Sequence, residues 1–90
     1  MAAIRDNEAL SRFELDANGV TAIATYKIAG NVITLMHTET PESARGQGIA
    51  SRLVEGALQT ARARGLKVVP RCPFVKLYFD KHPQFRDLLA

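Results

Sequence analysis

The stretch that most constrains this fold is Thr40-Pro41-Glu42-Ser43-Ala44-Arg45-Gly46-Gln47-Gly48-Ile49-Ala50. Strand-like alternation precedes it, and the most amphipathic segment of the chain follows it, so the stretch predicts a strand, a glycine-rich turn and a helix start. The first N–H groups of a helix have no partner inside it, and the helix dipole adds positive charge there. The stretch therefore predicts an anion site, for which phosphate or pyrophosphate is the natural occupant.

Three strands are expected before this turn, over residues 11–15, 20–28 and 32–38. Apolar and polar side chains alternate in the first two, which is typical of half-buried strands, and short turns join all three. They therefore predict an antiparallel meander. In the third strand Ile33, Leu35 and His37 share one face, and Val32, Thr34 and Met36 share the other. Because both faces are partly apolar, this strand is expected to be covered on both sides.

A helix is expected from residue 47 to residue 64, after the glycine-rich turn. One apolar stripe runs along it, formed by Ile49, Leu53, Val54, Ala57, Leu58 and Ala61. Residues 66–70 then predict a short strand, and a crossover through the helix would place it parallel to the third strand. Pro73 opens another helical segment, and residues 84–89 predict a last short helix. The expected fold is α/β of the α+β type: meander, crossover helix, a fourth parallel strand, then one or two short helices.

Ninety residues predict a single domain over residues 1–90. No apolar run is long enough to span a bilayer, the N-terminus has no signal-peptide core, and the single Cys72 cannot form an internal disulfide. These features favour a cytoplasmic protein without a membrane partner. The net charge of +3 suits an anionic ligand. Basic residues are spread along the chain without basic–aromatic alternation, so a nucleic-acid partner is not expected.

The spacing of Arg45, Gly48 and Ala50 reads Arg-x-x-Gly-x-Ala. It resembles the acetyl-CoA-binding turn of the GCN5-related N-acetyltransferases. Gly48 would let the backbone approach a pyrophosphate, Ala50 would keep the first helical turn narrow, and Arg45 could add a charged fork to phosphate oxygens. The alternative is an ordinary turn and helix start, because short Gly/Ala patterns recur by chance.

Further motifs are similar to a small single-domain subfamily, often called Yjdj-type. The matching stretches are His37-Thr38-Glu39-Thr40-Pro41, Arg45-Gly46-Gln47-Gly48-Ile49-Ala50, Leu53-Val54, Pro70-Arg71-Cys72-Pro73-Phe74-Val75 and His82-Pro83-Gln84-Phe85. The resemblance implies a minimal GNAT-like fold with acetyl-CoA as cosubstrate, an unidentified amine, peptide or protein acceptor, and a monomer or weak homodimer. Larger relatives carry extra elements that shape the acceptor pocket, so an open cleft, or a pocket finished by a partner chain, is expected.

The resemblance also implies the residues that hold the cofactor. They are Arg45, Gly46, Gln47, Gly48, Ile49 and Ala50 of the turn, together with Cys72 and Phe74.

Four residues are candidates for catalysis. His37 and Glu39, two positions apart on the third strand, face one side and could take a proton from the amine; otherwise they are a structural histidine and a solvated charge. Cys72 precedes a helix opened by Pro73 and could be a nucleophile, or a small buried residue. Tyr78 matches the tyrosine that protonates the CoA thiolate in the superfamily, or is a core aromatic. Two histidines and one cysteine at long separations predict no metal site.

Three classes of function follow: an acetyl-CoA-dependent N-acetyltransferase, a CoA- or acyl-CoA-binding module without robust catalysis, and, from charge alone, a small nucleic-acid binder. Thermal stabilisation by acetyl-CoA would test the cofactor site without knowledge of the acceptor.

Overall fold

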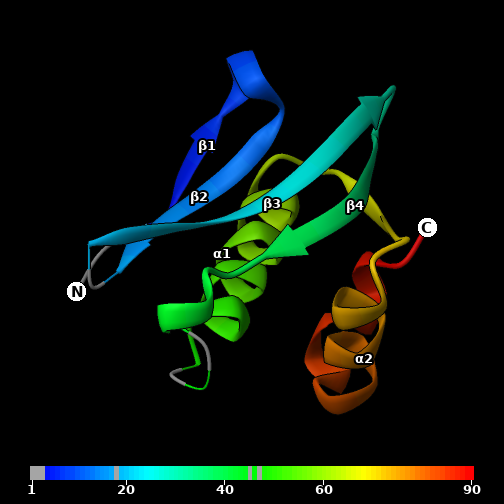
Figure 1. Cartoon of the computed structure of the whole chain (residues 1–90). Helices are drawn as coiled ribbons and strands as arrows, with labels where there is room; N and C mark the ends of the chain where they lie inside the picture. Colours follow the sequence, from blue (N-terminus) through cyan, green and yellow to red (C-terminus); the bar gives the residue numbers. More distant parts are fainter. Residues whose placement is uncertain (1–3, 18, 45, 47) are drawn as a thin grey trace.

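The computed structural model describes residues 4–17, 19–44, 46 and 48–90. Its centre is a five-stranded sheet in the order β1-β2-β3-β4-β5, which lies in front of α1 in Figure 1. The strands are β1 (Arg5–Asn7), β2 (Arg12–Ala17), β3 (Val20–Ala29), β4 (Val32–Glu39) and β5 (Lys67–Pro70). Neighbouring strands from β1 to β4 are antiparallel, and β5 is parallel to β4. The predicted meander and the parallel fourth strand are thus confirmed.

Within the described residues, two α-helices and three short 3-10 helices accompany the sheet. They are η1 (Glu8–Leu10), η2 (Glu42–Ala44), α1 (Ile49–Ala63), α2 (Pro73–Lys81) and η3 (Pro83–Leu88). Helix α1 begins at Ile49 rather than at residue 47, because Gly48 is the N-cap with a left-handed φ of 73°. The last segment is a 3-10 helix. No helix of the described chain is long and apolar enough to cross a membrane.

The core lies between the sheet and α1. All six residues of the predicted apolar stripe are buried: Ile49, Leu53, Val54, Ala57, Leu58 and Ala61. They meet the inward side chains of the strands, among them Phe13, Leu15 and Leu35. Helix α2 contributes Val75, Tyr78 and Phe79 to the same core, so α1 and α2 both pack on one face of the sheet.

The other face of the sheet is open, which corrects the expectation that β4 is covered on both sides. Cross-strand pairs place Thr25 beside His37 and Ile23 beside Glu39 on this face. His37 and Glu39 are exposed, and Thr34 is only half-buried. The open face carries too few apolar side chains, such as Val32, to require a second layer of helices. Within the described residues no helix covers this face.

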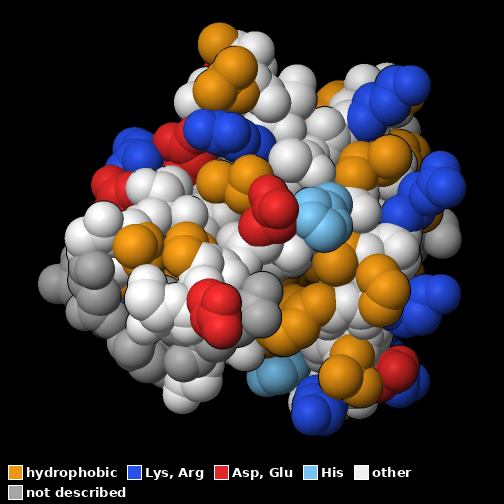
Figure 2. Space-filling model, viewed as in Figure 1, with side chains coloured by type: hydrophobic (Ala, Val, Ile, Leu, Met, Phe, Trp, Pro, Cys, Tyr) orange, Lys and Arg blue, Asp and Glu red, His pale blue; other side chains and the backbone are white. Residues whose placement is uncertain are grey.

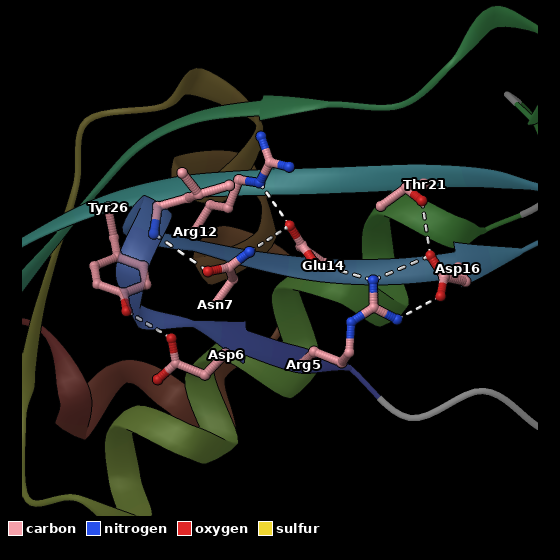
Figure 3. A network of polar contacts seen from close by, with 9 residues as sticks. Arg5, Asp6, Asn7, Arg12, Glu14, Asp16, Thr21 and Tyr26 are labelled. Carbon is pink, nitrogen blue, oxygen red and sulfur yellow. Dashed lines mark hydrogen bonds and ion pairs between the residues drawn. The ribbon is translucent and has the colours of Figure 1, made fainter.

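Strand β1 was not predicted, because it has only three residues and all are polar. It is held to β2 by Glu14 on the open face of the sheet, and the Glu14 side chain is 8% exposed. Glu14 accepts hydrogen bonds from Arg5 at 3.0 Å, Asn7 at 3.1 Å and Arg12 at 2.7 Å (Figure 3). On the core side, the hydroxyl of Tyr26 donates to Asp6 at 2.5 Å. Polar contacts therefore replace apolar burial at this edge.

These donors lower the pKa of Glu14 to about 2, with the hydrogen bond from Arg12 as the largest cause. The folded-state pKa lies below the ordinary value of 4.5, so the stabilisation is complete above that pH and is lost as pH falls toward 2. We therefore expect chemical denaturation between these two pH values to show a steeper loss of unfolding free energy for the wild type than for Glu14→Gln. The exposed Glu55→Gln serves as the control. If the unfolding free energy fell equally with pH in the wild type and in Glu14→Gln, Glu14 would not be the source of this stabilisation.

Candidate functional site

Strands β4 and β5 part halfway along β4. They pair only from Val32 with Lys67 to Leu35 with Pro70, after which the chain turns from β5 into α2. The carbonyl of Leu35 accepts N–H groups from both Arg71 and Cys72, each at 3.1 Å. Beyond this point β4 continues to Glu39 without β5 beside it. One edge of β4 is thereby left without a strand neighbour, next to the start of α2.

A β-bulge at Met36 decides which way the end of β4 faces. Tyr26 pairs with Leu35 and Thr25 with His37, so Met36 is the extra residue. A regular strand would have put Leu35 and His37 on the same face, as the sequence pattern predicted. Instead Thr38 faces the core side, opposite the buried Ala24, and His37 faces the open side. The predicted face for His37 was wrong for this reason.

The glycine-rich turn lies beyond the end of β4 and leads into α1. Gly46 and Gly48 have φ angles of 80° and 73°, a left-handed backbone that side chains other than glycine rarely adopt. A Cβ atom built on either glycine would meet no described atom within 4 Å, so the space beside them is open. The first turn of α1 has no acidic residue and no side-chain cap. Arg45 and Gln47, two of the predicted cofactor residues, lie outside the described residues.

A cavity of about 870 Å³ joins this turn to the free end of β4. Its described lining residues are Thr21, Ile23, His37, Thr38, Glu39, Thr40, Pro41, Glu42, Gly46, Gly48, Ile49, Ala50, Ser51 and Phe74. Figure 2 shows a histidine beside an acidic side chain near the centre of this face, with hydrophobic side chains around them; lysine and arginine side chains lie along the right edge, at the bottom and at the upper left. The predicted residues Gly46, Gly48, Ile49, Ala50 and Phe74 therefore share one cavity with His37 and Glu39.

Cys72 lies next to this cavity behind Thr38. It is the N-cap of α2, it is 4% exposed, and its Sγ lies 3.4 Å from Thr38 Oγ1. Burial raises the pKa of the Cys72 thiol, while the hydrogen bond with the Thr38 hydroxyl lowers it. Backbone N–H groups of Val75 and Phe74 at the start of α2 lower the pKa further, and the net shift is downward. These hydrogen-bond donors therefore favour the thiolate form of Cys72, which lies on the core side of β4.

His37 and Glu39 form the opposite wall, on the open face of the sheet. His37 Nε2 and Glu39 Oε1 are 3.7 Å apart, and the side chains are 63% and 62% exposed. The sequence expectation that both face one side is confirmed. Both groups are accessible from solvent, so they can exchange protons with a molecule that enters from the open face. Among the described residues, no cluster of His, Cys, Asp and Glu could hold a metal ion.

Phe74 and Tyr78 lie one turn apart on α2 and differ in exposure. Phe74 is 37% exposed and lines the cavity. Tyr78 is buried, stacks on His82 with ring centroids 3.8 Å apart, and is not among the lining residues. Burial, and to a lesser degree the charge of Glu55, raise the pKa of Tyr78. The structure thus brings Phe74, but not the Tyr78 hydroxyl, to the cavity, and the general-acid role of Tyr78 stays a prediction.

Sequence reasoning missed four lining residues that affect the chemistry of the cavity. Thr38 stands between His37 and Glu39 in the matched motif, yet only the bulge shows that it faces Cys72. Glu42 and Ser51 flank the glycine-rich turn, and their positions in the predicted turn and helix start could have identified them as lining residues. Ile23 carries no such signal, because nothing in its strand distinguishes it from neighbours that face the same way.

The contact between Thr38 and Cys72 can be tested by titration, since the chain has one cysteine. Removing the hydroxyl removes a donor to the thiolate, so we expect Thr38→Val to raise the pKa of Cys72. The ultraviolet absorbance of the thiolate as a function of pH measures it, and Cys72→Ala supplies the tyrosine background. Thr34→Val, the same change on the open face of β4, should leave the pKa of Cys72 unchanged. An unchanged midpoint in Thr38→Val would show that Thr38 does not act on the thiol.

Comparison with known proteins identifies the family. The family model described as GCN5-related N-acetyl-transferase matches residues 12–88. Protein NATD1 of Mus musculus is 32% identical over 75 residues, 80% of this chain and 68% of that protein, and Protein NATD1 of Danio rerio is 30% identical over 81 residues, 84% and 74%. The solution structure of a GCN5-like protein from Staphylococcus aureus superposes with a TM-score of 0.68 at 26% identity, covering 97% of this chain and 86% of that one. The chain belongs to the GCN5-related N-acetyltransferase family.

Proposed function

We propose that this protein is an acetyl-CoA-dependent N-acetyltransferase that acts on an amine. The observation that supports the proposal most directly is the single cavity that joins the glycine-rich turn to the free end of β4. One end of this cavity is suited to an anion, and the other carries groups that exchange protons. Acetyl-CoA would supply an activated acetyl group as a thioester.

The turn fits the pyrophosphate of CoA on grounds of space and charge. Gly46 and Gly48 leave open space where other residues would carry a Cβ. The first N–H groups of α1 lie at the positive end of the helix dipole, and no acidic side chain of the first turn offsets it. Ala50 and Ser51 are small and line the same part of the cavity. Arg45 and Gln47 are proposed as further phosphate contacts from their places in the sequence.

The free edge of β4 fits the remaining arm of CoA. Backbone groups of residues 36–39 on this side have no β5 neighbour, and polar backbone groups in a covered site need hydrogen-bond partners. The arm of CoA has amide groups that could supply them. Phe74 and Thr38 border this path, which leads from the turn toward Cys72.

Two routes for acyl transfer are open to this arrangement. In the direct route the amine loses a proton to His37, oriented by Glu39, and attacks the thioester, while the CoA thiolate leaves and is protonated by water. In the covalent route the thiolate of Cys72 attacks the thioester and the CoA thiolate leaves. The amine then attacks the acetyl group on Cys72, the cysteine thiolate leaves, and His37 accepts the proton of the amine. The lowered pKa of Cys72 supports the covalent route.

The second candidate function is a CoA-binding module without robust catalysis. It is favoured by the low exposure of Cys72 and by the position of Tyr78 outside the cavity lining. Turnover assays over a panel of amines and peptides, with acetyl-CoA binding measured in parallel, separate the two functions.

The cofactor site is best tested at Ser51, because a branched residue at Gly48 would disturb the left-handed backbone of the turn itself. Ser51 is the third residue of α1, where a carboxylate stabilises a helix by about 0.3–1 kcal/mol. Ser51→Glu should therefore keep the thermal stability of the free protein while it repels phosphate.

We expect the CoA affinity of Ser51→Glu to fall at least about tenfold by calorimetry, since unit charges about 4 Å apart near a surface interact by roughly 4 kcal/mol before screening. Ser51→Gln, which has the same size without the charge, should bind CoA more tightly than Ser51→Glu. Equal affinities for the two variants would place the phosphates elsewhere.

The route through Cys72 is tested by mass spectrometry after incubation with acetyl-CoA. A nucleophilic Cys72 should gain one acetyl group, and both Cys72→Ser and Cys72→Ala should lose the adduct and turnover. If the protein stays free of adduct and Cys72→Ala is active, the thiol only packs beside the cofactor, and direct attack by the amine is the mechanism.

A further inference from the structure

A second surface lies on the open face of the sheet, next to His37 and outside the cavity. Its central row runs from Lys27 on β3 through Thr34 on β4 to Val69 on β5, because the strand pairing places these residues side by side. None of the three lines the cavity, and every residue of these strands is described. We call this surface the sheet patch, and its members are Lys27, Val32, Thr34, Met36, Val69 and Arg71.

The floor of the sheet patch is largely apolar and accessible. Val32, Thr34 and Val69 are half-buried, and Met36 at the bulge is 41% exposed. Within the described chain no helix covers this face, and Figure 2 shows hydrophobic side chains beside the lysine and arginine side chains along the right edge. A partner that removes these apolar side chains from water would gain free energy.

Two cations border this floor without a carboxylate partner. Lys27 is exposed on β3, and Arg71 is exposed at the corner where the chain leaves β5, with its backbone N–H bound to the Leu35 carbonyl at 3.1 Å. Neither side chain forms an ion pair with a described residue, whereas arginines of β1, β2 and α1 do. The sheet patch thus combines unmatched positive charge with apolar surface, and complementary charge favours an acidic partner.

Other occupants fit the sheet patch less well. A second copy of this chain, related by a two-fold axis, would bring the same cations close together. Proteins bind single-stranded nucleic acid through stacking on aromatic side chains, and the open-face residues of β3, β4 and β5 include none. An anionic membrane surface is bound by clusters of several basic residues, whereas this patch has two.

The sheet patch adjoins the histidine that is proposed to accept a proton. Met36 directly precedes His37, and Thr34 lies three residues before it on the same strand. Strand residues rise by about 3.3 Å each, so the row that contains Lys27 lies roughly 10 Å from His37. This distance is greater than the length of a small amine, and it suits about three residues of an extended peptide.

We propose that the acceptor is a segment of another protein in which an acidic residue lies about three positions from the amine that is acetylated. Lys27 and Arg71 bind this acidic residue, and aliphatic side chains of the same segment pack on Val32, Met36 and Val69. The inference rests on the proposed function, because it assigns the open face of the sheet to the acceptor. The sheet patch then selects the acceptor, while the cavity beside it holds the cofactor.

The test measures peptide binding by calorimetry in the presence of saturating CoA, so that no acetyl group is transferred. The acidic probe is Glu-Ala-Val-Lys-Val-Ala-Glu with both ends blocked, which presents an acid three residues from the lysine in either chain direction. The matched probe replaces both glutamates by glutamine. Lys27→Gln and Arg71→Gln each remove one charge of the sheet patch, and Lys81→Gln removes the same charge from the last turn of α2 as a control.

We expect the wild type to bind the acidic peptide at least about threefold more tightly than the glutamine peptide, since each exposed ion pair contributes up to roughly fivefold. Lys27→Gln and Arg71→Gln should each reduce this ratio by about twofold, and the double variant should remove it. High salt should lower the ratio of the wild type, because exposed charge pairs are screened. Lys81→Gln should keep the ratio of the wild type, and all variants should keep its CoA affinity.

Equal affinities of the wild type for the two peptides, no binding of either at millimolar concentration, or a ratio that neither patch variant changes would overturn the inference. Tighter binding of oligouridylate, or of phosphatidylserine vesicles, than of the acidic peptide would overturn it as well. In each of these cases normal CoA affinity would leave the proposed function in place. A protein that does not bind CoA would instead refute the proposed function, and this inference with it.

Discussion

The carbonyl of Leu35 accepts hydrogen bonds from both Arg71 and Cys72, and at this shared acceptor β4 and β5 separate. The separation leaves the end of β4 unpaired on one side and starts α2 directly beside it. Had β5 continued for two more residues, Arg71 and Cys72 would lie within a strand beside β4 and would cover part of its free edge. The cavity, the position of the thiol and the access to Phe74 therefore all follow from where this pairing ends.

The bulge at Met36 then divides the site between the two faces of the sheet. Because one extra residue is inserted, Thr38 turns to the core side and reaches Cys72, while His37 and Glu39 turn to the open side. A one-residue change in register moves every following side chain to the other face. The bulge thus places Thr38, which contacts Cys72, and the exposed His37 on opposite faces of β4, three and two residues beyond Leu35, where the pairing with β5 ends.

Much of this fold could be predicted from the sequence, because its signals are local. The periodicity of Leu53, Ala57 and Ala61 identifies the buried side of α1, and Gly46 and Gly48 identify the turn. Strand β1 could not be predicted, since its stability comes from Glu14 across the sheet rather than from its own residues. The true face of His37 and the contact between Thr38 and Cys72 were also hidden, because a bulge depends on long-range pairing that leaves no local pattern.

The division of the site between two faces bears on the proposed chemistry. The N-terminus of α2 and Thr38 lie beside the thiol on the core side, whereas His37 and Glu39 are exposed on the open side. An acetyl group accessible to both must lie at the unpaired edge of β4, between the two faces. Under the proposed function, the anionic groups of the cofactor would be held at the start of α1, and this would fix how far its acetyl group reaches along the edge of β4. Alignment by a fixed helix terminus and an unpaired strand edge would then take the place of enclosure of the substrates by further elements.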